Sequence, residues 1–285
     1  MSRKTATLLI SCPDRTGIVA AVSEFVHRHG GNLVHSDQHT DRTAGLFLQR
    51  LEWEQERFAL SAAEFPAAFQ PLATRFEMTW ELRAAEQPPR MAILVSKHGH
   101  CLYDLLARHR MAQLGAEIPL VVSNHPDLES ATRDLGVDFL HLPVSPATKS
   151  QQEAALLERL QAERVDVIVL ARYMQVLSAG FLSHWQHRVI NIHHSFLPAF
   201  AGARPYHQAH ERGVKIIGAT AHYATQDLDE GPIIAQDVVR VSHRDSVRDL
   251  VAKGRDLEKI VLARAVSDHL ADRVLVYGNK TVVFD

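Results

Sequence analysis

The chain has 285 residues, of which 46% are hydrophobic and 22% charged, and its formal net charge is −2. This composition is typical of a soluble globular protein with one large domain or two ordinary ones, and no basic excess favours nucleic acid or an anionic membrane. The two cysteines are far apart, and no apolar run reaches the length of a membrane span. We therefore expect a cytoplasmic protein without disulfides.

The first part of the chain predicts the order strand, helix, strand, strand, helix, strand. Its strands alternate in polarity, and its helices repeat apolar side chains on one face. The expected strands are residues 5–11, 32–41, 45–54 and 77–83, and the expected helices are residues 18–26 and 65–76. This order predicts a ferredoxin-like βαββαβ domain.

The turn after the first predicted strand reads DRTG at residues 14–17, and Asn32 opens the second strand. Residues 12–36 thereby resemble the signature of the ACT-domain family. The resemblance implies a homo-oligomer that pairs through its sheets and holds a small amino-acid effector, such as methionine or glycine, at the paired interface. The implied effector-binding residues are Asp14, Arg15, Gly17 and Asn32. The same residues are also ordinary helix-cap and turn residues, so an interface without an effector stays open.

A polar segment that ends in two prolines separates this part from the rest of the chain. We place an ACT-like regulatory and oligomerisation domain at residues 1–83, a linker at 84–90 and a second domain at 91–285. In the second domain, short apolar runs at residues 91–96, 117–124, 137–143 and 165–171 alternate with helical segments. This α/β pattern predicts a Rossmann-like, doubly wound and mostly parallel sheet, whose ligands bind beyond the carboxyl ends of the strands.

The remaining elements of the second domain follow from the same patterns. Further strands are expected at residues 214–224 and 232–239, a helix near 244–269, and a final hairpin that turns at Gly278 and Asn279. The loop at residues 96–101 has only one glycine, so a phosphate-binding function for it is weakly supported. Residues 170–182 fit either core packing or the wall of a pocket for a flat heterocycle.

Polar side chains gather at the end of the apolar strand that begins near residue 189. Asn191 and His193 are two residues apart, so a strand would point both to one face, where two donors suit a developing oxyanion. A nearby carboxylate would keep the imidazole charged, and the later DLDEGP segment (227–232) supplies candidates. His193, His194, His207 and His210 offer possible metal ligands, but their spacing matches no standard zinc pattern, which favours a metal-free site.

The motifs NIHHSFLP, GATAHY and DLDEGPII within residues 189–236 are similar to the catalytic core of the folate-dependent formyltransferase family. The resemblance implies that Asn191, His193 and Asp229 are catalytic and that His222 supports them. It also implies that a folate is the substrate, with no further cofactor. The implied substrate-binding residues, which would hold the pterin largely through backbone contacts, are Tyr173, Met174, Gln175, Val176 and Leu177.

The chain departs from that family at two places. Residues 96–101 lack the glycines that bind the acceptor phosphate, and His194 replaces a proline. Both changes fall on the acceptor side, and together with the ACT-like domain they make the whole chain similar to the formyltetrahydrofolate deformylase family, in which water replaces the amine. From sequence alone, His194 either belongs to that replacement or fills a surface gap.

This resemblance implies a hydrolase of a linear amide C–N bond. It would convert 10-formyltetrahydrofolate to formate and tetrahydrofolate, balance one-carbon pools and supply formate for purine synthesis. Two alternatives stay open: a folate-dependent formyltransferase with an amine acceptor, and a non-enzymatic folate or amino-acid sensor.

Overall fold

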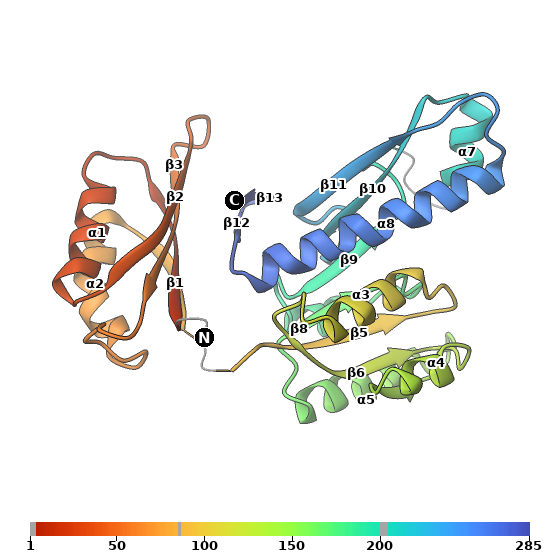
Figure 1. The fold of residues 1–285 in the computed structure, drawn as a ribbon, viewed down its shortest axis with the longest axis horizontal. Coiled ribbons are helices and arrows are strands. Elements are labelled where there is room, and N and C mark those ends of the chain that lie inside the picture. The colour runs from red at the N-terminus through yellow and green to blue at the C-terminus, as the bar shows by residue number, and fades with distance from the viewer. Residues whose placement is uncertain (1–3, 85–86, 200–204) are drawn as a thin grey trace. The chain divides into compact units, whose positions relative to one another are not determined.

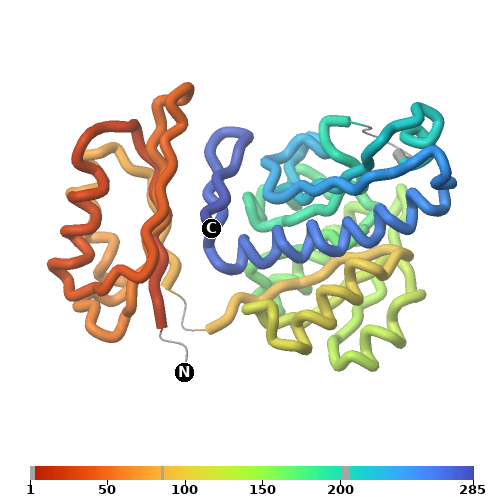
Figure 2. Tube along the Cα trace, turned by 45° about the horizontal axis from the view of Figure 1, so that its top comes forward, coloured from red at the N-terminus to blue at the C-terminus, as the bar shows by residue number. Residues whose placement is uncertain are grey.

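The computed structural model describes residues 4–84, 87–199 and 205–285. Its contacts divide the chain into two compact units, the first formed by Met1–Gln87 with Asp272–Asp285 and the second by Pro88–Ala271. Figure 1 labels their elements, and Figure 2 follows the chain from one unit to the other and back again.

The first unit is an antiparallel sheet covered by two helices on one face (Figure 1). Its elements are β1 (Thr5–Pro13), α1 (Ile18–Arg28), β2 (Asn32–Asp41), β3 (Leu46–Glu54), α2 (Phe65–Phe76) and β4 (Thr79–Arg83). The strand order β2-β3-β1-β4 confirms the predicted ferredoxin-like fold. Leu8 and Ile10 of β1 bury against Ile18, Val22 and Phe69 of the helices, because alternate strand residues face the same side.

A short hairpin at the end of the chain packs on the other face of this sheet. It consists of β12 (Val274–Tyr277) and β13 (Lys280–Val283). Leu275 and Phe284 pack against Leu9 and Leu48, whose side chains point away from the helices. The predicted boundaries differ here, since the sequence placed residues 272–285 with the second domain. The apolar outer face of the sheet accounts for the difference, because these residues bury it.

The second unit is built on a seven-stranded sheet of order β11-β10-β9-β8-β5-β6-β7. Its strands are β5 (Arg90–Val95), β6 (Glu117–Ser123), β7 (Asp138–His141), β8 (Val167–Leu170), β9 (Val189–His193), β10 (Ile216–Tyr223) and β11 (Ile233–Arg240). The neighbouring strands β9, β8, β5, β6 and β7 pair in parallel. Strand β10 pairs antiparallel with both β9 and β11. This mostly parallel sheet confirms the predicted Rossmann-like architecture.

Six helices accompany this sheet in the described part of the unit. They are α3 (His100–Arg110), α4 (Glu129–Asp134), α5 (Lys149–Ala162), α6 (Ala179–Ser183), α7 (Pro205–Arg212) and α8 (Val247–Leu270). Leu156 and Leu160 of α5 and Phe181 of α6 join the core formed with β5, β6 and β8. Helix α8 runs along β9, β10 and β11 and contacts α3 (Figure 1).

The sheet places three loops side by side. Because β5, β8 and β9 are parallel neighbours, their carboxyl ends lie at the same edge, and the chain leaves them at Val95, Leu170 and His193. Ligand sites in such sheets form at this edge.

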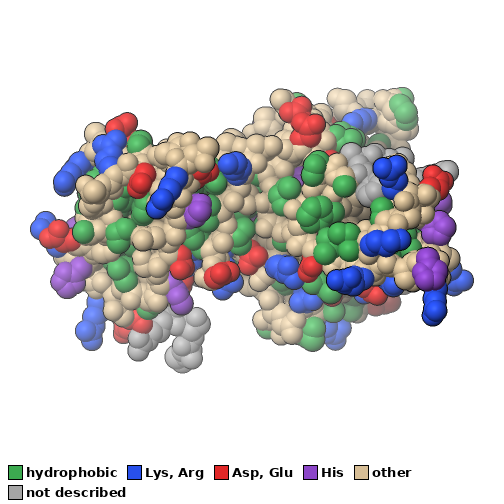
Figure 3. All heavy atoms as spheres, turned by 90° about the horizontal axis from the view of Figure 1, so that it is seen from above, with side chains coloured by type: hydrophobic (Ala, Val, Ile, Leu, Met, Phe, Trp, Pro, Cys, Tyr) green, Lys and Arg blue, Asp and Glu red, His purple; other side chains and the backbone are tan. Residues whose placement is uncertain are grey.

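Three further observations describe the chain as a whole. Acidic and basic side chains are interspersed on the face seen in Figure 3, in keeping with a net charge near zero. Cys12 and Cys101 are both buried free thiols. Within the described ranges, no helix has the length and hydrophobicity needed to cross a bilayer.

Candidate active site

A cavity of about 460 Å³ opens where β8 and β9 end. Three segments line it: residues 172–177 after β8, residues 191–194 at the end of β9, and a third stretch that contributes His222, Ala224, Thr225, Gln226, Leu228 and Asp229. All five residues predicted to hold the pterin belong to the first segment. Tyr173 is buried and its hydroxyl accepts a hydrogen bond from Gln152 Nε2 at 3.1 Å, whereas Met174 is 58% exposed. A volume of several hundred Å³ is the size of an ordinary small-molecule site.

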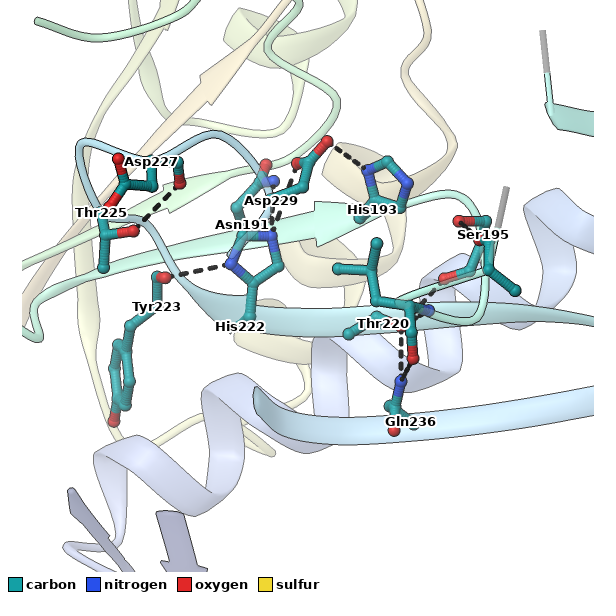
Figure 4. Close-up of polar contacts among 12 residues, drawn as sticks. Asn191, His193, Ser195, Thr220, His222, Tyr223, Thr225, Asp227, Asp229 and Gln236 are labelled. Carbon is teal, nitrogen blue, oxygen red and sulfur yellow. Dashed lines mark hydrogen bonds and ion pairs between the residues drawn. The ribbon is translucent and has the colours of Figure 1, made fainter. Parts of the chain in front are cut away.

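The end of β9 and the facing part of β10 bring three predicted residues together. Asn191 and His193 lie on the same face of β9, and His222 of β10 pairs directly with Asn191. The register of β10 against β11 shifts between Ala221 and His222. Such a bulge turns a side chain away from its regular direction, and here it accompanies a histidine that points into the site (Figure 4).

His222 is held from both of its ring nitrogens. Nδ1 lies 3.0 Å from the carbonyl oxygen of Tyr223, which can only accept, so Nδ1 carries a proton. Nε2 lies 3.2 Å from Asn191 Nδ2. In the neutral tautomer Nε2 therefore accepts from the amide, which fixes the orientation of Asn191.

Asp229 reaches the same group from the loop between β10 and β11. Its Oδ2 lies 3.1 Å from His193 Nδ1, and its Oδ1 lies 3.7 Å from His222 Nε2 (Figure 4). The backbone of Asp229 is left-handed, with φ of 60°, a conformation that aspartate tolerates better than most residues.

The loop that carries Asp229 is tight because β10 and β11 meet just behind it. The Tyr223 N–H donates to the carbonyl of Pro232 at 2.9 Å. A Cβ added to Gly231 would lie 1.8 Å from the Tyr223 carbonyl oxygen, so only glycine permits this approach. Gly231 therefore helps to bring the acidic turn over the two histidines.

The two histidines control the charge of Asp229. The hydrogen bond from His193, followed by the contact with His222, holds the pKa of the Asp229 carboxyl well below its usual range, against the opposing effect of burial. Asp229 is thus ionised near neutral pH and positioned to accept a proton.

Polar side chains of β10, of β11 and of the loop itself support the loop that leaves β9. Thr220 Oγ1 donates to the Ser195 carbonyl at 2.9 Å and accepts from the Leu197 N–H at 3.0 Å. Gln236 Nε2 donates to Thr220 Oγ1 at 2.9 Å, and Ser195 Oγ donates to the Ala199 carbonyl at 2.8 Å (Figure 4). The polar segment at the end of β9 therefore contains both residues that line the cavity and residues that support the loop.

His194 lines the cavity and does not fill a surface gap. Its ring lies 5.1 Å from the His193 ring and 6.0 Å from the Tyr206 ring. Burial, followed by the charges of Arg172 and His193, lowers the pKa of His194 to about 4. His194 is therefore neutral in the folded protein at neutral pH.

The depressed pKa of His194 predicts an acid-sensitive contribution to stability. His194 takes up a proton near pH 6.5 in the unfolded chain but only near pH 4 in the folded protein. Protonation therefore favours the unfolded chain, and the free energy of unfolding decreases as the pH falls from about 6.5 toward 4. By pH 4.5 this loss should be roughly 2–3 kcal/mol. We expect His194→Gln to reduce the drop in urea midpoint between pH 7.5 and 4.5. The exposed control His243→Gln should retain the full drop, and an unchanged drop in His194→Gln would contradict this assignment.

The predicted effector residues are not brought together within one chain. Gly17 is the N-cap of α1, and Arg15 forms an exposed ion pair with Glu77 at 2.6 Å. Gly17 and Arg15 follow β1 closely, at the end of the sheet where Pro13 pairs with Leu46 of β3. Asn32 pairs with Glu54 at the opposite end of β3, roughly 26 Å away. A site that uses all of these residues therefore needs a second copy of the chain.

Sequence reasoning missed a buried charged group beside the cavity. Glu258 of α8 is 1% exposed and contacts His100, Tyr206 and Arg172. No sequence motif joins these residues, which come from four separate segments. The ligand atoms of His100, Cys101 and Glu258 lie within 4.8 Å of one another, but burial strongly raises the pKa of the Cys101 thiol, which disfavours the thiolate that a metal would need.

Comparison with known proteins identifies both parts of the chain. The formyl transferase family model matches residues 89–266, and the ACT domain model matches residues 6–51. The chain is 56% identical to the formyltetrahydrofolate deformylase of Synechocystis sp. over the full length of both proteins. It is 42% identical to that of Escherichia coli over 95% of each chain.

Solved structures give the same result. A formyltetrahydrofolate deformylase from Pseudomonas syringae superposes with a TM-score of 0.96 at 48% identity, covering 100% of this chain and 96% of that one. Glycinamide ribonucleotide transformylase 1 from Symbiobacterium toebii has a TM-score of 0.66 at 34% identity and covers 70% of this chain and 96% of its own. The predicted resemblance is confirmed: the chain belongs to the formyltetrahydrofolate deformylase family, with an ACT domain ahead of a formyl transferase domain.

Proposed function

We propose that the protein hydrolyses 10-formyltetrahydrofolate to formate and tetrahydrofolate. The observation that carries this proposal is the Asp229 carboxylate, placed between His193 and His222 in a cavity that also presents the Asn191 amide. The reaction needs only the folate and water. Full-length similarity to enzymes of this name supports it further.

In the proposed mechanism, Asp229 removes a proton from the attacking water, directly or through a second water. Asp229 is ionised at neutral pH and so can accept this proton, but its lowered pKa makes it a weak base that passes the proton on readily. Water attacks the formyl carbon, the carbonyl oxygen gains negative charge, and the C–N10 bond then breaks as N10 takes the proton.

Asn191 and His193 would stabilise the oxyanion of the tetrahedral intermediate. The Asn191 amide nitrogen carries two hydrogens, one of which is directed at His222, so the second is available to the substrate oxygen. Asp229 Oδ2 lies 3.1 Å from His193 Nδ1, which orients the imidazole and leaves Nε2 as the atom that can face the substrate. His193 Nε2 is buried without a hydrogen-bond partner among the described residues, an arrangement that is costly and characteristic of functional sites.

The pterin would lie against Tyr173–Leu177, where the backbone is already fixed. The Met174 N–H donates to Ser96 Oγ at 2.9 Å, and Glu153 Oε1 accepts from the Ser178 N–H at 2.9 Å. These contacts anchor both ends of the segment, so that its remaining backbone groups can meet a flat ring in a defined geometry.

One assay separates the proposal from its alternatives. The protein is incubated with 10-formyltetrahydrofolate and no amine. Equal release of formate and tetrahydrofolate is expected. Release that requires an added amine would favour a formyltransferase, and binding of the folate without turnover would favour a sensor.

The ACT-like unit, residues 1–83 in the predicted division, would regulate the enzyme as a homo-oligomer. Because Asn32 lies far from Arg15 and Gly17 in one chain, a small amino acid would bind between paired copies. Titration with methionine and glycine should show binding and a change in the rate of formate release. If neither binds, the unit serves only as an interface.

The buried free thiols of Cys12 and Cys101 are in keeping with a reducing cytoplasm. There the formate would supply purine synthesis, and its release would balance one-carbon pools.

A further inference from the structure

A buried cluster around Glu258 lies beside the cavity and takes no part in the mechanism above. His100 Nε2 lies 2.8 Å from Glu258 Oε2, and the Tyr206 hydroxyl donates to Glu258 Oε1 at 2.6 Å. Arg172 Nε forms an ion pair with Oε2 at 3.5 Å. A buried carboxylate is costly unless it is paired, and Glu258 has two hydrogen bonds and this longer ion pair, in which Arg172 Nε makes no hydrogen bond among the described residues. The four residues come from α3, α7, α8 and the end of β8.

Two local features show that the chain accommodates this cluster at a cost. Arg172 has a left-handed backbone with φ of 66°, which is unfavourable for a residue that carries a Cβ. Gly254 lies one helical turn before Glu258, and a Cβ there would lie 2.0 Å from the Tyr206 hydroxyl. A left-handed non-glycine backbone and an interior helix glycine are each unfavourable, so together they point to a specific use of the side chains they position.

The cluster stands between the candidate catalytic groups and the loop at residues 96–101. Arg172 lines the same cavity as Asn191, His193 and Asp229. Its carbonyl accepts from the Ser96 N–H at 3.2 Å, so it is joined to the start of that loop, and His100 is at the far end of it. This is the loop that departs from the formyltransferase pattern on the acceptor side.

We propose that Arg172, paired with a Glu258 that His100 and Tyr206 hold in place, closes the acceptor side of the cavity so that water but not an amine reaches the formyl carbon. This inference rests on the proposed hydrolysis. A single water needs only about 30 Å³, whereas an amine acceptor needs a continuous path for its whole carbon skeleton. Arg172 lines the cavity and would narrow that path, and Glu258, His100 and Tyr206 act as positioning residues for it.

Removing the Arg172 side chain should let an amine reach the formyl carbon and compete with water. In hydrolysis, a C–O bond forms, the C–N10 bond breaks and a proton from water passes to N10. In the competing reaction, a C–N bond to the amine forms, the C–N10 bond breaks and a proton from the amine passes to N10, which yields an N-formyl amine and tetrahydrofolate.

The test uses the full chain with 10-formyltetrahydrofolate and glycinamide as the amine probe. The measured quantity is the ratio of N-formylglycinamide to formate. Arg172→Gly removes the side chain and suits the left-handed backbone, so it should fold and raise this ratio at least about tenfold over the original protein. Glu258→Gln should raise it by a smaller factor, because Arg172 loses its charged partner but keeps its place in the chain.

Arg248→Ala provides the matched control, since Arg248 is an exposed arginine on the same helix. Its ratio should equal that of the original protein. An unchanged ratio in Arg172→Gly would overturn the inference, and so would loss of both products in a folded variant that still binds folate. If the original protein releases no formate, the proposed hydrolysis itself fails, which is a separate result.

Discussion

Replacing Asp229 with asparagine should lower kcat for formate release about 10³-fold while folate binding stays intact. Asparagine has nearly the same shape but cannot accept the proton of the attacking water, and general-base catalysis contributes about 10²–10⁴-fold. The change also removes the negative charge that faces His193 Nδ1 at 3.1 Å, so the imidazole loses its carboxylate partner. Steady-state kinetics and equilibrium folate binding measure the two effects.

Asp227 offers a matched control for this substitution. It lies two residues earlier in the same loop, is exposed, and does not line the cavity. Asp227→Asn should therefore retain turnover within about twofold, as surface substitutions usually do. Near-normal turnover in Asp229→Asn, with folate bound as before, would refute the role of Asp229 as the base.

Asn191→Ala should lower kcat by about 10²–10³-fold with little change in KM. Loss of one oxyanion donor typically has this effect, because the hydrogen bond strengthens only as the carbonyl oxygen gains charge. The substitution also leaves His222 Nε2 without its 3.2 Å contact to the amide. Kinetic constants for Asn191→Ala and for the cavity-lining control Gln226→Ala measure the effect.

The separate effects on kcat and KM show whether Asn191 stabilises the oxyanion or only binds the folate. A fall in kcat alone indicates an interaction that forms in the transition state, whereas a rise in KM at constant kcat indicates uniform binding of the folate. The second pattern would show that Asn191 holds the ground-state substrate and does not stabilise the oxyanion.

Much of this architecture follows from short-range patterns in the sequence. The parallel sheet was predictable because its strands are buried on both faces and read as continuous apolar runs. The shared face of Asn191 and His193 was predictable because side chains on a strand repeat every two residues. Helix α2 continued through Pro71, although proline in a helix interior is unfavourable, because Phe65, Phe69 and Phe76 bury against the sheet.

Contacts between distant segments were not predictable in the same way. Leu275 and Phe284 give no sign that they cover Leu9 and Leu48, since a hairpin pattern does not specify its neighbour. Glu258 looks like an ordinary polar residue of a long helix, and only the fold shows that it meets His100 and Tyr206. The bulge beside His222 also depends on pairing with β11, which no local pattern specifies.

The central claim is that water attacks the formyl group beside Asp229. It is tested by incubating the protein with 10-formyltetrahydrofolate in oxygen-18 water without any amine, and analysing the formate by mass spectrometry. We predict formate with one labelled oxygen, released in equal amount to tetrahydrofolate, and loss of this product in Asp229→Asn. Formate without label, or no formate until an amine is added, would contradict the claim.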